Sequence, residues 1–236
     1  MKIRFLTSAL VLVALAPTVP AEPGETIAAA PFQSGERLRY DVVWPSGLTL
    51  GEATFTANAE TGGWAFGAEI RASLPNFEIR ENHQARADAG LCSKELQKDA
   101  RRGNKTVQET VIFDQNRGTA ERSTEGGGAS RLEIPPCARD GLTYFYFLRQ
   151  DLARGRIPPP DDLNFGSQYA VTVTYAESRE VEASGKLHAS DRILVDLMGA
   201  GSSHSFEIFF SKDETRKPLL IKVPFEMGTF SLRLVE

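Results

Sequence analysis

The chain has 236 residues, of which 41% are hydrophobic, and its 27 Lys and Arg against 31 Asp and Glu give a formal net charge of −4. This mildly acidic balance argues against nucleic acid as a partner. The length is sufficient for one β domain with a sizeable core.

The first 21 residues have the features of a secretory signal peptide. A short basic start precedes an apolar run from Phe5 to Ala16, and small residues follow before a break. The run is too short to span a bilayer, and Pro17 and Pro20 interrupt it. We expect cleavage after Ala21 and a periplasmic or secreted protein, with no transmembrane segment after removal of residues 1–21. No Cys follows the expected cleavage site, which disfavours lipid attachment there.

Residues 22–31, rich in Ala and Pro, are expected to form a flexible leader before a single domain at 32–236. Within that domain Cys92 and Cys137 are the two cysteines. An even pair in an oxidising compartment favours a disulfide, which would stabilise the fold by roughly 4 kcal/mol on the chain-entropy model. Two free thiols are the alternative, and their spacing supports no redox or zinc motif.

The first half of the domain alternates apolar and polar residues with the period of β strands. Gly62–Gly63 and Gly103–Asn104 mark two of the turns between them, and the triple glycine at 126–128 lacks the Lys and Ser or Thr of a phosphate-binding loop. Strands are expected near residues 37–44, 48–59, 64–70, 77–88, 91–102, 107–113 and 132–134.

One strand pair is unusually basic. Lys94, Lys98, Arg101, Arg102 and Lys105 occur within twelve residues of one another. They are a candidate contact for an anion, such as a phosphate-bearing lipid or the acidic face of a partner. The alternative is a solvated pair of strands and their turn.

The segment Asp140 to Gly155 is the one long stretch with helical character. Asp140 is a suitable N-cap, and Gly155 followed by three prolines supplies the end. Phe145, Leu148 and Leu152 recur at helical spacing, so this wide apolar face must be buried. We therefore predict a central helix at 140–155.

Two interpretations of this helix are open. Its aromatic face either fills the concave side of the sheet as ordinary core or also lines a cavity for an apolar ligand, in which case Tyr144, Phe145, Leu148 and Arg149 are the tentative ligand-binding residues. Arg149 would either pair with a carboxylate under the sheet or face the anionic head group of a ligand.

The second half has the alternation of an antiparallel meander. Strands are expected at 169–175, 181–189 with Gly185 inside the strand, 193–197, 206–210, 219–225 and 230–234.

The sequence contains no motif for catalysis, metal binding or a cofactor. His83, His188 and His204 have no second ligand at metal-binding spacing. Serines flank His204, but the chain has no nucleophile elbow of the form G-x-S-x-G. We therefore predict no catalytic residues, no metal and no cofactor.

Three clusters resemble those of the bacterial exported family known as domain of unknown function 3108. They are Phe32–Tyr40 followed by Gly51, Asp140–Arg149, and Ser211–Pro218. The resemblance spans residues 32–234 and implies a β protein of the periplasm or cell envelope, without established activity. In the third cluster, Asp213 is expected to cap backbone N–H groups of a hairpin and to pair with Arg216.

The expected fold is mainly β, an antiparallel curved sheet or open half-barrel of about a dozen strands with one helix packed on the inner face. This shape is similar to the half-barrels of periplasmic lipoprotein carriers, a likeness that concerns fold alone. The predicted function is non-enzymatic binding of an apolar or lipid-like ligand. Two alternatives are a structural or protein-interaction module of the cell envelope with a filled core, and a hydrolase, for which no motif was found.

Overall fold

The computed structural model describes residues 30–74, 77–164, 167–225 and 228–236. The expected signal peptide at 1–21 and the leader up to residue 29 lie outside these residues. The first part of the described chain forms β1 (Glu36–Val43), β2 (Thr49–Glu60), β3 (Gly63–Leu74), β4 (Phe77–Asp88), β5 (Ser93–Arg102), β6 (Lys105–Asp114), β7 (Thr119–Thr124), β8 (Ala129–Glu133) and β9 (Arg139–Asp140). The second part forms α1 (Gly141–Ala153), β10 (Asp161–Asn164), β11 (Gln168–Ala183), β12 (Lys186–Met198), β13 (Ser203–Ser211), β14 (Pro218–Phe225) and β15 (Gly228–Leu234).

All fifteen strands belong to one open sheet. Their order is β8-β7-β6-β5-β4-β3-β2-β1-β15-β14-β13-β12-β11-β10-β9, so each half of the chain is a meander and the pair β1–β15 joins the halves. The pairs are antiparallel except β9 with β10. The predicted mainly β class and open sheet are confirmed, and the predicted number of strands is slightly low.

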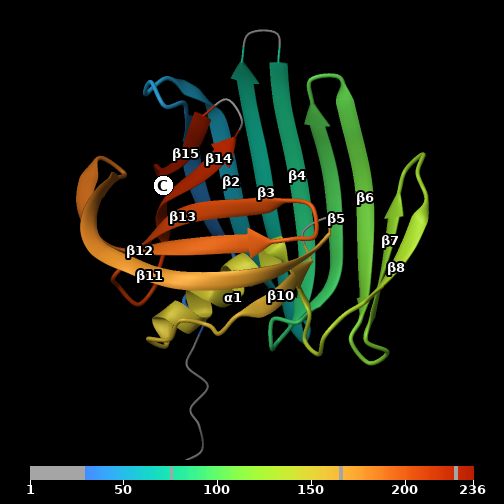
Figure 1. The fold of residues 1–236 in the computed structure, drawn as a ribbon. Helices are drawn as coiled ribbons and strands as arrows, with labels where there is room; N and C mark the ends of the chain where they lie inside the picture. The colour runs from blue at the N-terminus through green and yellow to red at the C-terminus, as the bar shows by residue number, and fades with distance from the viewer. Residues whose placement is uncertain (1–29, 75–76, 165–166, 226–227) are drawn as a thin grey trace, which may run out of the picture.

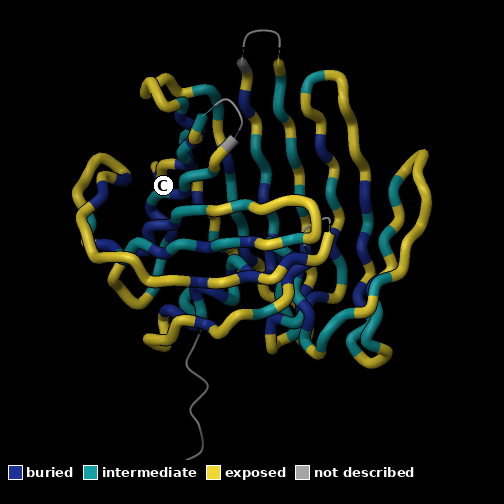
Figure 2. Tube along the Cα trace, in the orientation of Figure 1, coloured by how far each residue is buried: buried dark blue, intermediate teal, exposed yellow. Residues whose placement is uncertain are grey.

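The sheet curves back on itself around α1. In Figure 1 strands β11 to β13 run across the strands β3 to β5, and α1 lies toward the lower end of the molecule. The helix contacts β3, β4, β9 and β10. Figure 2 shows the buried residues concentrated along the inner side of the sheet and on the helix. This arrangement confirms a helix on the inner face.

The helix begins where local chemistry predicts. Asp140 is the N-cap, and its carboxylate accepts hydrogen bonds from the backbone N–H groups of Leu142 at 2.8 Å and Thr143 at 3.0 Å. The same carboxylate accepts a hydrogen bond from the hydroxyl of Ser93 at the start of β5. The cap therefore also fixes the helix to the sheet.

The helix is buried on two opposite flanks. Leu142 and Tyr146 pack into a core cluster with β3 to β7, whereas Tyr144, Leu148 and Leu152 pack into a second cluster with β1 and β10 to β15. The wide apolar face is thus explained by a helix that separates two cores.

A disulfide joins Cys92 and Cys137, with their Cα atoms 4.6 Å apart. It connects the start of β5 to the segment before β9. A backbone hydrogen bond of 3.0 Å from Ser93 N–H to the Ala138 carbonyl reinforces this connection. The entry to the helix is therefore held against the first half of the sheet.

One predicted strand is wrong. The segment 181–189 is divided by a turn at Ser184–Gly185, where both residues have positive φ. The residues before the turn end β11, and those after it begin β12. A turn fits here because Gly185 at φ +69° adopts a left-handed conformation without steric cost.

Candidate functional site

The four residues predicted from the helix have different environments. The side chains of Tyr144 and Leu148 are buried, and burial raises the pKa of Tyr144 well above its ordinary value of 10.0. Phe145 is only half-buried, although it lies on the inner side of the sheet. Arg149 is fully buried.

Arg149 is bound on all sides by groups of this chain. Its guanidinium forms a two-point ion pair with the carboxylate of Glu36 on β1, at 2.6 Å and 3.1 Å. It also donates to the carbonyls of Thr215 at 3.0 Å and Arg216 at 3.2 Å. The two hydrogen bonds to Glu36 are the expected pairing with a carboxylate, and the two to carbonyls occupy further donors of the guanidinium. We call this arrangement the Arg149 clasp.

The clasp joins the three sequence clusters that carry the family resemblance. Glu36 belongs to the first, Arg149 to the second, and the two carbonyls to the hairpin at 211–218. In this hairpin Asp213 caps the backbone N–H of Thr215 at 2.9 Å, as expected. The side chain of Arg216, however, pairs with Asp191 at 2.7 Å and not with Asp213. Asp191 lies on the neighbouring β12, whereas the carboxylate of Asp213 is occupied by hydrogen bonds from Ser211 and Thr215.

A group of large apolar side chains on the inner face remains partly open to solvent. The strand register places its sheet members on the same side as buried core residues, for example Phe55 opposite Leu38 and Phe206 opposite Val195. The ring of Phe145 lies against Phe55, with ring centroids 5.3 Å apart. We call this group the apolar surface; it comprises Phe55, Ile70, Ile79, Phe145, Phe206 and Val223.

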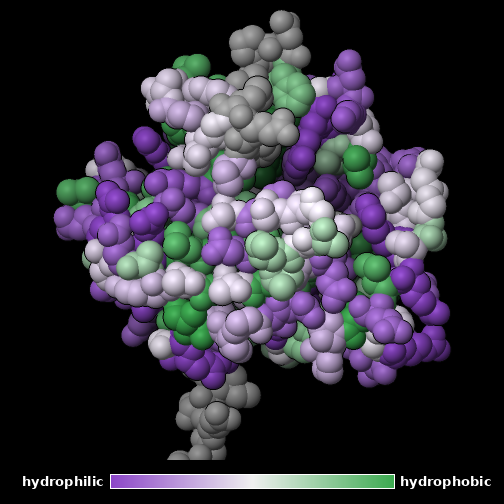
Figure 3. All heavy atoms as spheres, viewed as in Figure 1, coloured by the Kyte–Doolittle hydropathy of each residue, from purple (hydrophilic) through white to green (hydrophobic). Residues whose placement is uncertain are grey.

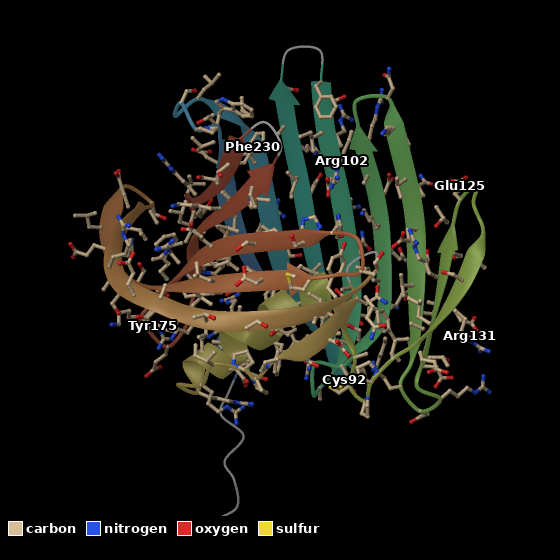
Figure 4. The ribbon with its side chains drawn as sticks, viewed as in Figure 1. Cys92, Arg102, Glu125, Arg131, Tyr175 and Phe230 are labelled. Atoms are coloured by element: carbon tan, nitrogen blue, oxygen red, sulfur yellow. A yellow bond between two sulfur atoms is a disulfide. The ribbon has the colours of Figure 1, made fainter. Side chains whose placement is uncertain are left out.

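The apolar surface extends toward the end of the sheet opposite the disulfide. Figure 4 shows Phe230 and Arg102 at that end, and Cys92 at the other. Phe230 stacks edge-on with Trp44 at 4.6 Å, which closes the β1–β15 side of this end. In Figure 3 hydrophobic atoms are visible in a hollow among polar side chains at the same end. The protein therefore does not fill its concave side completely.

Next to the apolar surface, charged side chains line the inner face of β4 to β7. In the strand register Ile70 lies opposite Glu81, and Ile79 opposite Arg102. His83 in turn lies opposite Lys98 on β5. We call this group the charged ladder; it comprises Glu81, His83, Lys98, Arg102, Glu109 and Arg122.

Two ion pairs organise the ladder. Glu81 accepts hydrogen bonds from Arg102 at 2.6 Å and interacts with His83 at 3.1 Å, and Arg122 donates to Glu109 at 2.6 Å. Burial raises the pKa of Glu81, but its hydrogen bond with His83 and the charge of Arg102 outweigh this effect and lower the pKa below its ordinary value. Glu81 is therefore ionised at neutral pH.

Part of the ladder is left without a partner. Glu109 is 5% exposed, and its Oε1 atom has no hydrogen-bond partner among the described residues. Lys98 forms no ion pair within the part of the chain that the structure describes. Buried or half-buried charges without partners are costly, so such groups are candidates for contact with a ligand.

Two shallow grooves are present on the surface. The larger, of about 550 Å³, is lined mainly by polar residues of β4 to β7 such as Gln84, Gln97 and Gln108, and Lys98 and Glu109 of the charged ladder also line it. The second, of about 370 Å³, lies between the β11–β12 turn and strands β14 and β15. Neither contains the residues predicted from the helix.

The comparison with family models assigns the chain to a protein family. The model described as protein of unknown function (DUF3108) matches residues 39–235. The chain belongs to the DUF3108 family. A search of the curated proteins gives no match. The DUF3108 match covers the clasp except for Glu36, and it includes all members of the apolar surface and the charged ladder.

Other site types find no support in the described residues. No three His, Cys, Asp or Glu side chains within them are grouped as a metal site requires. Among the same residues, no helix is long and apolar enough to cross a membrane. The apolar surface and the charged ladder are thus the features that remain to be explained.

Proposed function

We propose that this DUF3108 protein is a non-enzymatic binding protein for an apolar or lipid-like ligand, which it holds on the concave face. The observation that carries the proposal is the apolar surface. Six large apolar side chains face inward and contact the core, and yet they keep part of their area in water. Exposed apolar area that is gathered on a concave face is characteristic of ligand sites.

The energetics favour such a ligand. Completing the burial of a large apolar side chain that is already half-buried contributes up to about 1 kcal/mol, at about 25 cal/mol per Å². Six side chains acting together can therefore contribute several kcal/mol to binding, before the entropic cost of association is subtracted. Aromatic rings such as those of Phe55, Phe145 and Phe206 add contact area with few rotatable bonds.

We also propose that the protein is exported to the periplasm or cell envelope. The expected signal peptide at 1–21 supports this location, and so does the disulfide between Cys92 and Cys137, because disulfides persist mainly in oxidising compartments. A lipid-like ligand would be available in the same compartment.

Native mass spectrometry with lipid extraction tests the proposal on protein purified from a periplasm. The variant Phe206→Glu places a charge on the apolar surface at a half-buried position opposite the uncharged Val195, so the fold should tolerate it. The matched control is Ile112→Glu, because Ile112 is 48% exposed and lies on the outer face of β6.

Wild-type protein and the Ile112→Glu variant should carry a co-purifying lipid or fatty acid, and Phe206→Glu should lose it while keeping its circular dichroism spectrum. A wild-type protein that is free of lipid and takes up none when it is added would refute the proposal. The search would then turn to protein partners of the envelope.

A further inference from the structure

The inner face of β5 carries an alternation of long cationic and small residues. Lys98, Ala100 and Arg102 point to the same side, because side chains two residues apart in a strand share a face, about 7 Å from one another. Ala100 is buried and small, and its neighbours across the strands are Glu81 and Val107. Two long cationic side chains therefore flank a small, buried residue on the inner face of this strand.

Both cations retain donors that can act on a ligand. Lys98 has no ion pair among the described residues, although it lies opposite Glu109, which accepts from Arg122 through Oε2 alone. Arg102 is half exposed and uses its Nε and Nη2 groups on Glu81. Its Nη1 group has no hydrogen bond in the part of the chain that the structure describes.

The local charge is positive in a protein whose net charge is −4. Lys98, Arg102 and Arg122 in the ladder oppose two carboxylates, and Lys105 lies opposite Arg102 on the same face. Such a field favours an anion. On the opposite face of the same strand the alternation places the acidic Asp99.

We infer that the ligand of the concave face is an anionic amphiphile whose oxyanion accepts hydrogen bonds from Lys98 and Arg102 on β5. Its acyl chain lies on the apolar surface, which begins at Ile79, the neighbour of Arg102 in the register. The inference rests on the proposed function, because it names the head group of the same ligand. A carboxylate and a phosphate share the required chemistry, since both accept hydrogen bonds from ammonium and guanidinium groups.

Isothermal titration calorimetry with single-chain amphiphiles below their micellar concentrations tests the inference. Laurate supplies a carboxylate, dodecyl phosphate a phosphate, and monolaurin a neutral head on an acyl chain of the same length. The main variant is Lys98→Gln, which breaks no ion pair and should fold normally. Arg102→Gln is the second variant, and Arg101→Gln is the matched control, because Arg101 is exposed on the outer face of the same strand.

Laurate or dodecyl phosphate should bind wild type about tenfold or more tightly than monolaurin, as one charge-assisted contact predicts. Lys98→Gln should weaken binding of the anionic probe by about the same factor and leave monolaurin binding unchanged. Arg101→Gln should change the binding of neither probe. The ratio between the two anionic probes identifies which oxyanion the site prefers.

Equal affinity for anionic and neutral probes, together with no effect of Lys98→Gln, would overturn the inference and leave the proposed function intact. Absence of binding by all three probes would overturn both. The two failures are therefore distinguishable.

Discussion

Removing one partner of the Arg149 clasp should destabilise the protein severely. In Arg149→Met the carboxylate of Glu36, whose side chain is 12% exposed, would lose its cation, and the carbonyls of Thr215 and Arg216 would lose their donor. Breaking a buried ion pair from one side costs about 3–5 kcal/mol, mainly because the other charge stays buried. We expect a loss of this size.

Urea unfolding at pH 7 measures the effect. With a denaturant dependence on the order of 2 kcal/mol per M, the unfolding midpoint should fall by roughly 1.5–2.5 M. Arg149→Lys should recover less than half of the loss, because an ammonium cannot bind both carboxylate oxygens and two carbonyls in the same geometry. The control is Arg39→Met, since Arg39 pairs with Glu236 at the surface and such pairs contribute about 1 kcal/mol or less.

A double-mutant cycle separates the clasp from the packing of its side chains. Glu36→Met combined with Arg149→Met removes both charges, so the double variant should be more stable than the sum of the two single losses predicts, by about 2 kcal/mol or more. A midpoint shift below roughly 0.5 M for Arg149→Met, or strictly additive losses, would show that the clasp is not the buried ion pair described above.

Three further predictions concern stability. Replacing Cys92 and Cys137 together by Ala should lower the free energy of unfolding by roughly 2–4 kcal/mol in urea titrations, and an unchanged midpoint would contradict a disulfide. Asp140→Ala removes the helix cap and the partner of the buried Ser93 hydroxyl, so a loss of about 2–4 kcal/mol is expected by the same assay; a loss below about 1 kcal/mol would contradict it. The pKa of Glu81 is lowered in the folded state, so its ionised form stabilises the fold above its unfolded pKa, and this contribution disappears as the pH falls. Glu81→Gln should therefore cost about 1–2 kcal/mol at pH 7, and the difference from wild type should shrink as the pH falls below the ordinary carboxyl pKa and through the lowered pKa of Glu81; a difference independent of pH would refute this assignment.

The helix and most strands were predictable because their signals are local. Asp140 satisfies free N–H groups within its own turn, and alternation along residues such as Leu38 and Tyr40 needs no distant partner. The error at 181–189 arose where this signal fails. The residues in the middle of β11, from Tyr175 to Glu180, are all exposed. The alternation of apolar and polar residues is therefore missing there, and the sequence does not show that one strand continues to Ala183.

The site was predictable only in part. The sequence indicates the basic segment as a candidate anion contact. It also indicates that the cations lie on two faces of the strand, because residues two apart share a face: Lys98 and Arg102 share the face of the buried Leu96, and Arg101 does not. The apolar surface could not be predicted, since a half-exposed Ile70 and a fully buried Val195 look the same in sequence. Only the tertiary arrangement decides which inward side chains the chain itself covers.

The incomplete core has a geometric origin. One helix of thirteen residues is about 20 Å long, whereas the sheet that it must cover contains fifteen strands. The clasp and the disulfide hold this helix toward one end of the concave face, where the two core clusters meet. At the other end no second helix is present among the described residues, and the inward apolar side chains of β2 to β4, β13 and β14 there are only partly buried. In the proposed function an acyl chain would complete this burial, and Lys98 and Arg102 beside it would bind the head group and so set the direction of the chain.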